Sequence, residues 1–143
     1  MRASKVAAAV LIRSNETQMA RTTPKRSESA LLDYALSFPG ATEEWPWDER
    51  VIKVNGKIFV FLGFVATTLR VGVKLPVSSE MALTLPFVEK MGYGLGKSGW
   101  VTARFEKGET PPINLLKGWI EQSYRAVAPK KLIHVLDQKK AAA

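Results

Sequence analysis

Val51-Ile52-Lys53-Val54-Asn55-Gly56-Lys57-Ile58-Phe59-Val60-Phe61-Leu62 is the stretch that decides the fold. It places Asn-Gly between two runs of β-branched and aromatic residues. This pattern predicts a β-hairpin, because both central residues of its tight turn need a positive φ. The second run is apolar throughout and leaves its own orientation open. If Ile58, Val60 and Leu62 face the core, Phe59 and Phe61 face outward.

Two more strands are predicted further along the chain. Residues 69–75 carry an apolar side chain at every odd position. In residues 100–105, the apolar Val, Ala and Phe alternate with Trp, Thr and Arg. Alternation with period two is typical of a strand with one buried and one solvated face. The residues expected on the solvated face are Arg70, Lys74, Trp100, Thr102 and Arg104.

Helices are predicted before and after these strands. The first begins at Ser27 or Ser29 and ends at Pro39-Gly40, where the chain cannot continue as a helix. The last follows Pro111-Pro112 and ends before Pro129. Both carry apolar side chains at helical spacing, so each has one face to bury.

The segments between these elements complete the predicted order. Residues 78–91 indicate a helix that Pro86 kinks or divides, and the acidic, tryptophan-bearing residues 42–48 indicate a loop. The predicted order of elements is helix, three strands, helix, strand and helix. This order favours an α+β fold, in which helices pack on one face of an antiparallel sheet and solvent covers the other. The predicted core comprises Leu32, Leu36, Ile58, Val60, Val71, Val73, Val101, Phe105, Leu116 and Ile120.

The length of 143 residues and the hydrophobic content of 46% fit one domain, which we expect at 27–138. Residues 1–26 are interpreted as a flexible basic arm, with Met19 as an alternative start to Met1, and residues 139–143 as a tail. No apolar run reaches the ~20 residues that span a bilayer. The N-terminal apolar run is followed by no signal-peptide cleavage site, so we expect a cytoplasmic protein.

The net charge of +8 is unevenly distributed. Residues 27–138 hold 13 basic and 12 acidic side chains, but residues 27–49 hold six acidic and no basic ones. The predicted domain is therefore polarised rather than uniformly basic, which weakens the case for a committed nucleic-acid binder. The absence of cysteine excludes disulfides and thiolate metal sites.

Several segments together resemble one family. They are residues 36–44 with Trp45-Pro46-Trp47, residues 53–59, residues 70–74, and Gly92-Tyr93 to Lys97-x-x-Trp100. Over residues 29–130 the chain resembles the MmcQ/YjbR family of small bacterial proteins, and this resemblance implies a CyaY-like (frataxin-like) fold. Members are often described as candidate DNA-binding proteins with a double-wing motif, and the resemblance implies no particular reaction. The family tends to have polar residues where Gly94, Gly96 and Gly99 stand here.

No motif in the sequence predicts a catalytic or cofactor-binding site. Residues 94–99 match G-x-G-x-x-G, but the motif must follow a strand and open a helix, whereas here a helix precedes and a strand follows. We interpret these glycines as allowing a tight or positive-φ connection into the following strand. His134 is the single histidine and has no partner in sequence for base catalysis. The carboxylates of residues 43–49 suit a hard cation as a distant alternative, so we expect no enzyme, no cofactor and no resident metal.

Two functional hypotheses from different classes remain. The first is a non-enzymatic module that binds DNA or RNA through the outer sheet face, where cations neutralise phosphates and an indole stacks on bases. Its candidate residues are Arg70, Lys74, Lys97, Trp100 and Arg104. The second is a protein-interaction or small-ligand module with an aromatic pocket. Its candidate residues are Trp45, Trp47, Trp100 and Trp119.

Overall fold

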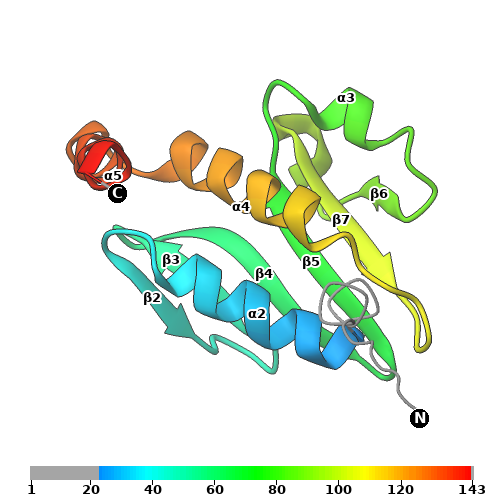
Figure 1. Ribbon diagram of the computed structural model, residues 1–143. Helices are drawn as coiled ribbons and strands as arrows, with labels where there is room; N and C mark the ends of the chain where they lie inside the picture. Colours follow the sequence, from blue (N-terminus) through cyan, green and yellow to red (C-terminus); the bar gives the residue numbers. More distant parts are fainter. Residues whose placement is uncertain (1–22, 143) are drawn as a thin grey trace, which may run out of the picture.

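A six-stranded antiparallel sheet forms the centre of the computed structural model, which describes residues 23–142 (Figure 1). Its strand order is β2-β3-β4-β5-β7-β6. The strands are β2 (Ala41–Glu44), β3 (Val51–Val54), β4 (Lys57–Val65), β5 (Thr68–Lys74), β6 (Val88–Lys90) and β7 (Trp100–Phe105). The helices are α2 (Pro24–Leu36), α3 (Ser79–Ala82), the 3₁₀ turn η1 (Leu95–Ser98), α4 (Ile113–Val127) and α5 (Lys130–Ala142). The predicted α+β class is confirmed.

Helices α2 and α4 lie side by side across one face of the sheet (Figure 1). The aromatic side chains of Phe38, Phe59 and Tyr124 meet between these layers, with ring centroids 4.8–6.2 Å apart. The Tyr124 hydroxyl donates a hydrogen bond of 2.6 Å to the Pro39 carbonyl. The Ser123 hydroxyl donates to the Phe59 carbonyl and accepts a bond of 2.8 Å from the Lys74 N–H. These bonds satisfy polar groups that burial would otherwise leave without partners.

The hairpin predicted at Asn55-Gly56 is confirmed, with φ values of +53° and +77° at its two central residues. The two strands then lose register by one residue, because Ile52 pairs with Val60 while Lys53 pairs with Ile58. Phe59 is therefore the extra residue of a β-bulge, which re-aims the side chains on either side of it.

The bulge settles the orientation that the sequence left open. Val60 and Leu62 face the helices, Phe61 faces outward, and the fully buried Phe59 also points into the core. Ile58 lies beside Lys53 on the outer side and is only partly buried, so its assignment to the core was wrong. A register shift reverses the side-chain alternation, and an all-apolar run gives no sign of it.

The remaining predicted core residues occupy the helix-covered side. Val60, Val71, Val73, Val101, Phe105, Leu116 and Ile120 are buried in the main core, and Leu32 and Leu36 are partly buried against it. The strand phases predicted for β5 and β7 are therefore confirmed. The largest fully buried side chains include Tyr124, Phe59 and Leu31.

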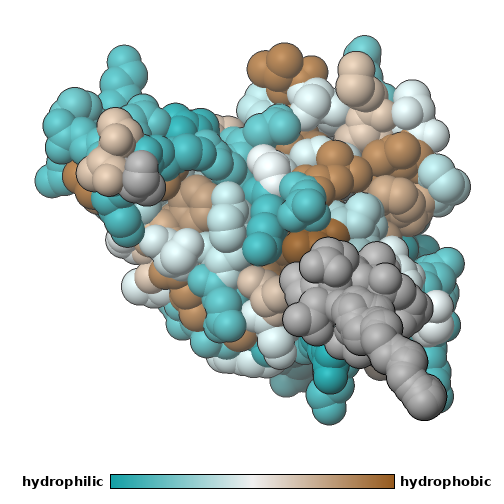
Figure 2. Space-filling model, viewed as in Figure 1, coloured by the Kyte–Doolittle hydropathy of each residue, from teal (hydrophilic) through white to brown (hydrophobic). Residues whose placement is uncertain are grey.

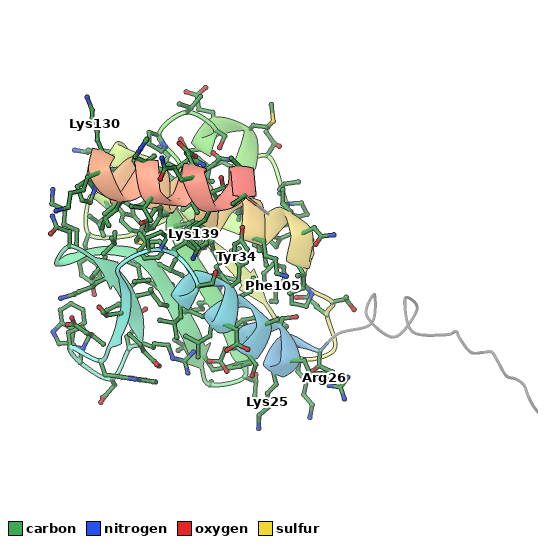
Figure 3. All side chains as sticks on the ribbon, turned by 60° about the vertical axis from the view of Figure 1, so that its left-hand side comes forward. Lys25, Arg26, Tyr34, Phe105, Lys130 and Lys139 are labelled. Atoms are coloured by element: carbon green, nitrogen blue, oxygen red, sulfur yellow. The ribbon has the colours of Figure 1, made fainter. Side chains whose placement is uncertain are left out.

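Helix α2 begins earlier than the sequence indicated. Thr23 is its N-cap, with the side-chain oxygen accepting a hydrogen bond of 3.3 Å from the Arg26 N–H, and Pro24 takes the first helical position. Proline suits that position because its missing N–H would have no intrahelical partner there. Ser27 is fully buried inside the helix and is not a cap. The side chains of Lys25 and Arg26 point away from the molecule (Figure 3).

Both predicted domain boundaries fall inside helices. Residues 24–26, which the sequence assigned to the arm, form the first turn of α2, and residues 139–142 continue α5. The remainder of the expected arm, residues 1–22, lies outside the described residues. No sequence signal in our interpretation predicted α5, which is tied to α4 by ion pairs from Arg125 to Asp137 (2.7 Å) and from Lys140 to Glu121 (2.8 Å).

Two other segments differ from the sequence prediction. The helix expected over 78–91 is a single turn, α3, after which the chain forms the edge strand β6. Pro86 explains the break, since proline clashes with the preceding helical turn and lacks an N–H. The expected loop at 42–48 begins as strand β2, whose Glu43 and Glu44 form ion pairs with Arg50 (3.0 Å) and Lys53 (3.1 Å).

The surface over the helices mixes polar and apolar side chains. Figure 2 looks onto this side and shows hydrophilic side chains over α5 and more apolar ones toward α3. Val77 and Met81, which flank the start of α3, are among the exposed large hydrophobic residues. Within residues 23–142, no helix combines the length and the apolar character needed to cross a bilayer.

Candidate ligand-binding pocket on the outer face of the sheet

The outer face of β5 and β7 carries the side chains that the sequence placed there. Arg70 pairs with Arg104, Gly72 with Thr102, and Lys74 with Trp100. Because paired residues of an antiparallel sheet share a face, all these side chains point away from α2 and α4.

This face is not fully solvated as expected. Trp100 is 8% exposed, and its ring meets that of Phe61 edge to face at a centroid distance of 5.5 Å. Thr102 is also buried, and so is Val51, the partner of Phe61 in the neighbouring strand pair. The outer face therefore has its own small apolar layer, and the Trp100 ring is not available as an open stacking surface.

The loop from β6 to β7, residues 91–99, covers this layer. Its backbone closes on itself through the bond from Gly96 N–H to the Met91 carbonyl (3.2 Å), and the donor Gly96 belongs to η1. Gly94 and Gly99 have φ values of +78° and +92°, which confirms the predicted positive-φ connection at these two glycines, whereas Gly96 has no positive φ. A Cβ at Gly99 would lie 2.8 Å from the Leu75 carbonyl oxygen, which excludes any larger residue there.

Gly72 lets this loop approach the sheet. A Cβ built on Gly72 would clash with the terminal methyl of Met91 and would lie 3.2 Å from the Phe61 Cβ. The glycine in the middle of an alternating strand is thus the sequence signal for a close approach, which our interpretation of the sequence missed.

A pocket of about 640 Å³ lies between the loop, the strands and the turn that joins β2 to β3. This volume is in the range that holds small organic ligands. The turn provides Trp47 and Glu49, the strands provide Phe61 and Arg70, and the loop provides Met91 and Tyr93. Aromatic and aliphatic side chains therefore form most of the wall.

Two aromatic residues of this wall are unusually open to solvent. Trp47 is 68% exposed, and Tyr93 is fully exposed with a φ of +59°. A bulky residue rarely adopts a positive φ, because its Cβ then approaches the backbone closely. Such backbone conformations cluster at binding sites, and the sequence offered no sign of this one.

The pocket is lined by two charged side chains, Arg70 and Glu49. Within the described part of the chain, neither Arg70 nor Glu49 forms an ion pair. Arg104, the cross-strand neighbour of Arg70, lies 3.5 Å from Glu89 on β6. Arg70 is thus the cation of this face that a ligand can reach from the pocket.

The other candidate residues lie elsewhere. Lys74 is half-buried beside Trp100, and Lys97 is exposed on η1. The Trp45 ring packs at 5.0 Å under the guanidinium of Arg50, which pairs with Glu28 of α2. Trp119 is buried on α4, across the sheet from the pocket. The four tryptophans are therefore not brought together, and of them only Trp47 lines this pocket.

Metal ligation and base catalysis gain no geometric support. In residues 23–142, no three side chains of His, Cys, Asp or Glu cluster as metal ligands do. Glu43 and Glu44 are engaged by Arg50 and Lys53. His134 is exposed on α5, away from the pocket lining.

The fold and this pocket together define an α+β protein with a ligand-sized hollow on the sheet face that the long helices leave uncovered. The YjbR family model matches residues 36–126, more than half of the chain, and the chain belongs to this family. The resemblance inferred from the sequence is thereby confirmed.

A solved structure supports the same assignment. The crystal structure of the Deinococcus radiodurans protein DR2400, with a DUF419 domain, is similar at 25% sequence identity. The similarity covers 73% of this chain and 79% of that one, with a TM-score of 0.56. No curated protein matches the chain.

Proposed function

We propose that this YjbR-family protein is a binding module that holds a small, largely apolar organic molecule in the outer-face pocket. The observation that carries the proposal is the presence of two exposed aromatic side chains, Trp47 and Tyr93, at one pocket of ligand size. Large aromatic side chains lose free energy when they stay in water, and a flat ligand that covers them recovers it.

The chemistry of the wall supports binding rather than catalysis. The polar side chains in the lining of this pocket are those of Glu49, Arg70, Tyr93 and Thr102. Nucleophilic catalysis needs a nucleophile within reach of a base that a third group orients, and the described lining has no such set. A mostly apolar wall with few polar groups is typical of a site that orients a ligand without transforming it.

The test is a titration with 2-naphthalenemethanol, a neutral flat compound, followed by NMR. We expect shifts of the Trp47 indole N–H and the Met91 methyl, with no change at the buried Trp119. Trp47→Ala should weaken binding about three- to tenfold, because one aromatic contact is lost. Trp45→Ala is the matched control, since that ring is also exposed but lies outside the pocket. Equal affinities of the two variants would contradict the proposal.

Nucleic acid is a second candidate partner, and the pairing of Arg70 with Arg104 favours it. Like charges directly opposite one another on a sheet are unfavourable, and a bound phosphate would offset their repulsion. The support is weaker than for the pocket, because Glu89 already accompanies Arg104 and the Trp100 ring is buried.

A further inference from the structure

The pocket brings together two opposite charges, and neither has an ion-pair partner among residues 23–142. Arg70 comes from the middle of β5 and Glu49 from the turn before β3. Among residues 23–142, neither charge is paired, either with the other or with a third group. A ligand in the pocket therefore meets one cation and one anion against an apolar wall.

The setting of Arg70 explains why its guanidinium needs an outside anion. On β4 its partner is Gly63, which has no side chain and has open space where a Cβ would be. On β7 its partner is Arg104, a like charge whose acidic neighbour is Glu89. One side of Arg70 is thus empty, the other is repulsive, and its third direction opens into the pocket.

The setting of Glu49 limits how much negative charge a ligand can carry. Its carboxylate lines the same pocket and is exposed, so it repels any anion that enters. A monoanion can reach Arg70 against this repulsion, because it forms charge-assisted hydrogen bonds with the guanidinium fork. A second negative charge doubles the attraction to Arg70 and the repulsion from Glu49 alike, so Glu49 offsets part of what the second charge gains.

We infer that the ligand of the outer-face pocket is an aromatic carboxylate, whose ring lies against Trp47, Phe61 and Tyr93 and whose single negative charge pairs with Arg70. Glu49 reduces the advantage that a phosphorylated compound of the same shape would gain from its second charge. This inference rests on the proposed function, since it names the class of molecule that the apolar pocket takes.

The experiment compares three test compounds that share one ring system. They are 2-naphthoate, 2-naphthalenemethanol and 2-naphthyl phosphate, each titrated into the full chain and followed by NMR at Trp47 and at the Arg70 side chain. We expect the carboxylate to bind about tenfold tighter than the alcohol, as is usual for a hydrogen bond between charged groups. The phosphate should gain much less from its second charge than the carboxylate gains from its first, because Glu49 repels both charges.

Variants assign these preferences to residues. Arg70→Gln should abolish the preference for the carboxylate over the alcohol, whereas Arg70→Lys, which keeps the charge, should retain part of it. Lys74→Gln is the matched control, because Lys74 is on the same strand and face but outside the pocket. Glu49→Gln should raise the affinity for the phosphate relative to the carboxylate.

The outcomes separate the inference from the proposed function. If all three compounds bind the wild-type chain equally, or if the carboxylate preference survives in Arg70→Gln, the inference is wrong while the pocket remains a binding site. An unchanged phosphate-to-carboxylate ratio in Glu49→Gln overturns the role of that residue. If the alcohol does not bind or binds without affecting Trp47, the proposed function itself fails. Backbone spectra and thermal unfolding of each variant verify its fold.

Discussion

Gly72 connects the sheet to the wall of the pocket. The space that a side chain would fill is occupied by the Met91 methyl and the edge of Phe61. Because glycine has no side chain, it allows a loop to pack closely on the strand. The pocket therefore depends on a residue that cannot itself contact a ligand through a side chain.

Gly72→Val should lower the free energy of unfolding by about 1–3 kcal/mol, because the added methyl groups overpack this contact. Met91 should move, and its methyl resonance should shift. Gly63→Val on β4 is the control, since nothing lies within 4 Å of the position of its Cβ. Denaturant unfolding of both variants measures the difference. Equal stability of the two would contradict the close packing of Met91 on Gly72.

Val73 tests the phase of the central strand. It is fully buried in the core, and its neighbour Lys74 faces the other side. Val73→Asp should cost about 3 kcal/mol or more, because it leaves a charge buried without a partner. Lys74→Asp should change stability by less than about 1 kcal/mol. Thermal unfolding measures both, and a mild effect at Val73 would refute the assigned phase.

Among the elements, strands with clean alternation could be predicted from sequence and edge elements could not. β5 and β7 show period two in their sequences because one face of each strand is buried under helices. Val71, Val73 and Val101 can therefore be recognised as core residues from the sequence. β2 and β6 are short edge strands with charged, exposed residues such as Glu44 and Glu89. Their pairing is decided by the strand beside them and not by their own composition.

The site was harder to predict than the fold. Arg70 and Trp47 were recognised as residue types that bind ligands, but the sequence could not place them at one pocket. That placement needs the bulge at Phe59, the loop that folds back over β5 and the positive φ of Tyr93. Each is a tertiary feature without a local pattern.

The link between α4 and α5 should depend on pH. Burial raises the pKa of Glu121, but hydrogen bonds from Lys140 and Arg125 outweigh it, and the pKa is lowered overall. A hydrogen bond from Arg125 likewise lowers the pKa of Asp137. A lowered folded-state pKa means that this stabilisation is present above the usual carboxyl pKa and is lost as the pH falls through the lowered value.

As the pH is lowered, the packing of α5 should therefore weaken at a higher pH than the packing of the sheet does. The protection of α5 amides from exchange, relative to their intrinsic rates, should fall as the pH drops below the usual carboxyl pKa and these two carboxylates take up protons. Glu121→Gln should produce the same loosening at neutral pH, by about 0.5–1 kcal/mol, since solvent screens such partly exposed pairs. Glu80→Gln, an exposed position without an ion pair in the described residues, is the control. If the ratio of amide exchange rates in α5 and in β5 does not change with pH, the ion pairs do not hold α5 on α4.

At the scale of the whole molecule, ion pairs reduce the charge asymmetry that the sequence shows between residues 27–49 and the rest of the domain. The acidic segment 27–49 folds against cations of β3 and the residue before it, with Glu28 and Glu43 both on Arg50 and Glu44 on Lys53. Among residues 23–142, cations without an ion pair lie on several different elements, such as Lys25 on α2, Lys57 on β4 and Lys97 on η1. In this part of the chain a nucleic acid would therefore find scattered contacts.

The triple change Arg70→Glu, Lys74→Glu and Arg104→Glu tests whether the outer face binds nucleic acid at all. If each cation contacts a phosphate of a single strand, the slope of log affinity against log salt should fall by about 2, because fewer counterions are released. The control reverses three exposed lysines of α5, Lys130, Lys131 and Lys139, with the same change in net charge. Fluorescence anisotropy with single-stranded DNA at several salt concentrations measures both. An equal loss in the two variants would mean that binding follows net charge, and the outer face would keep only its pocket as a recognition site.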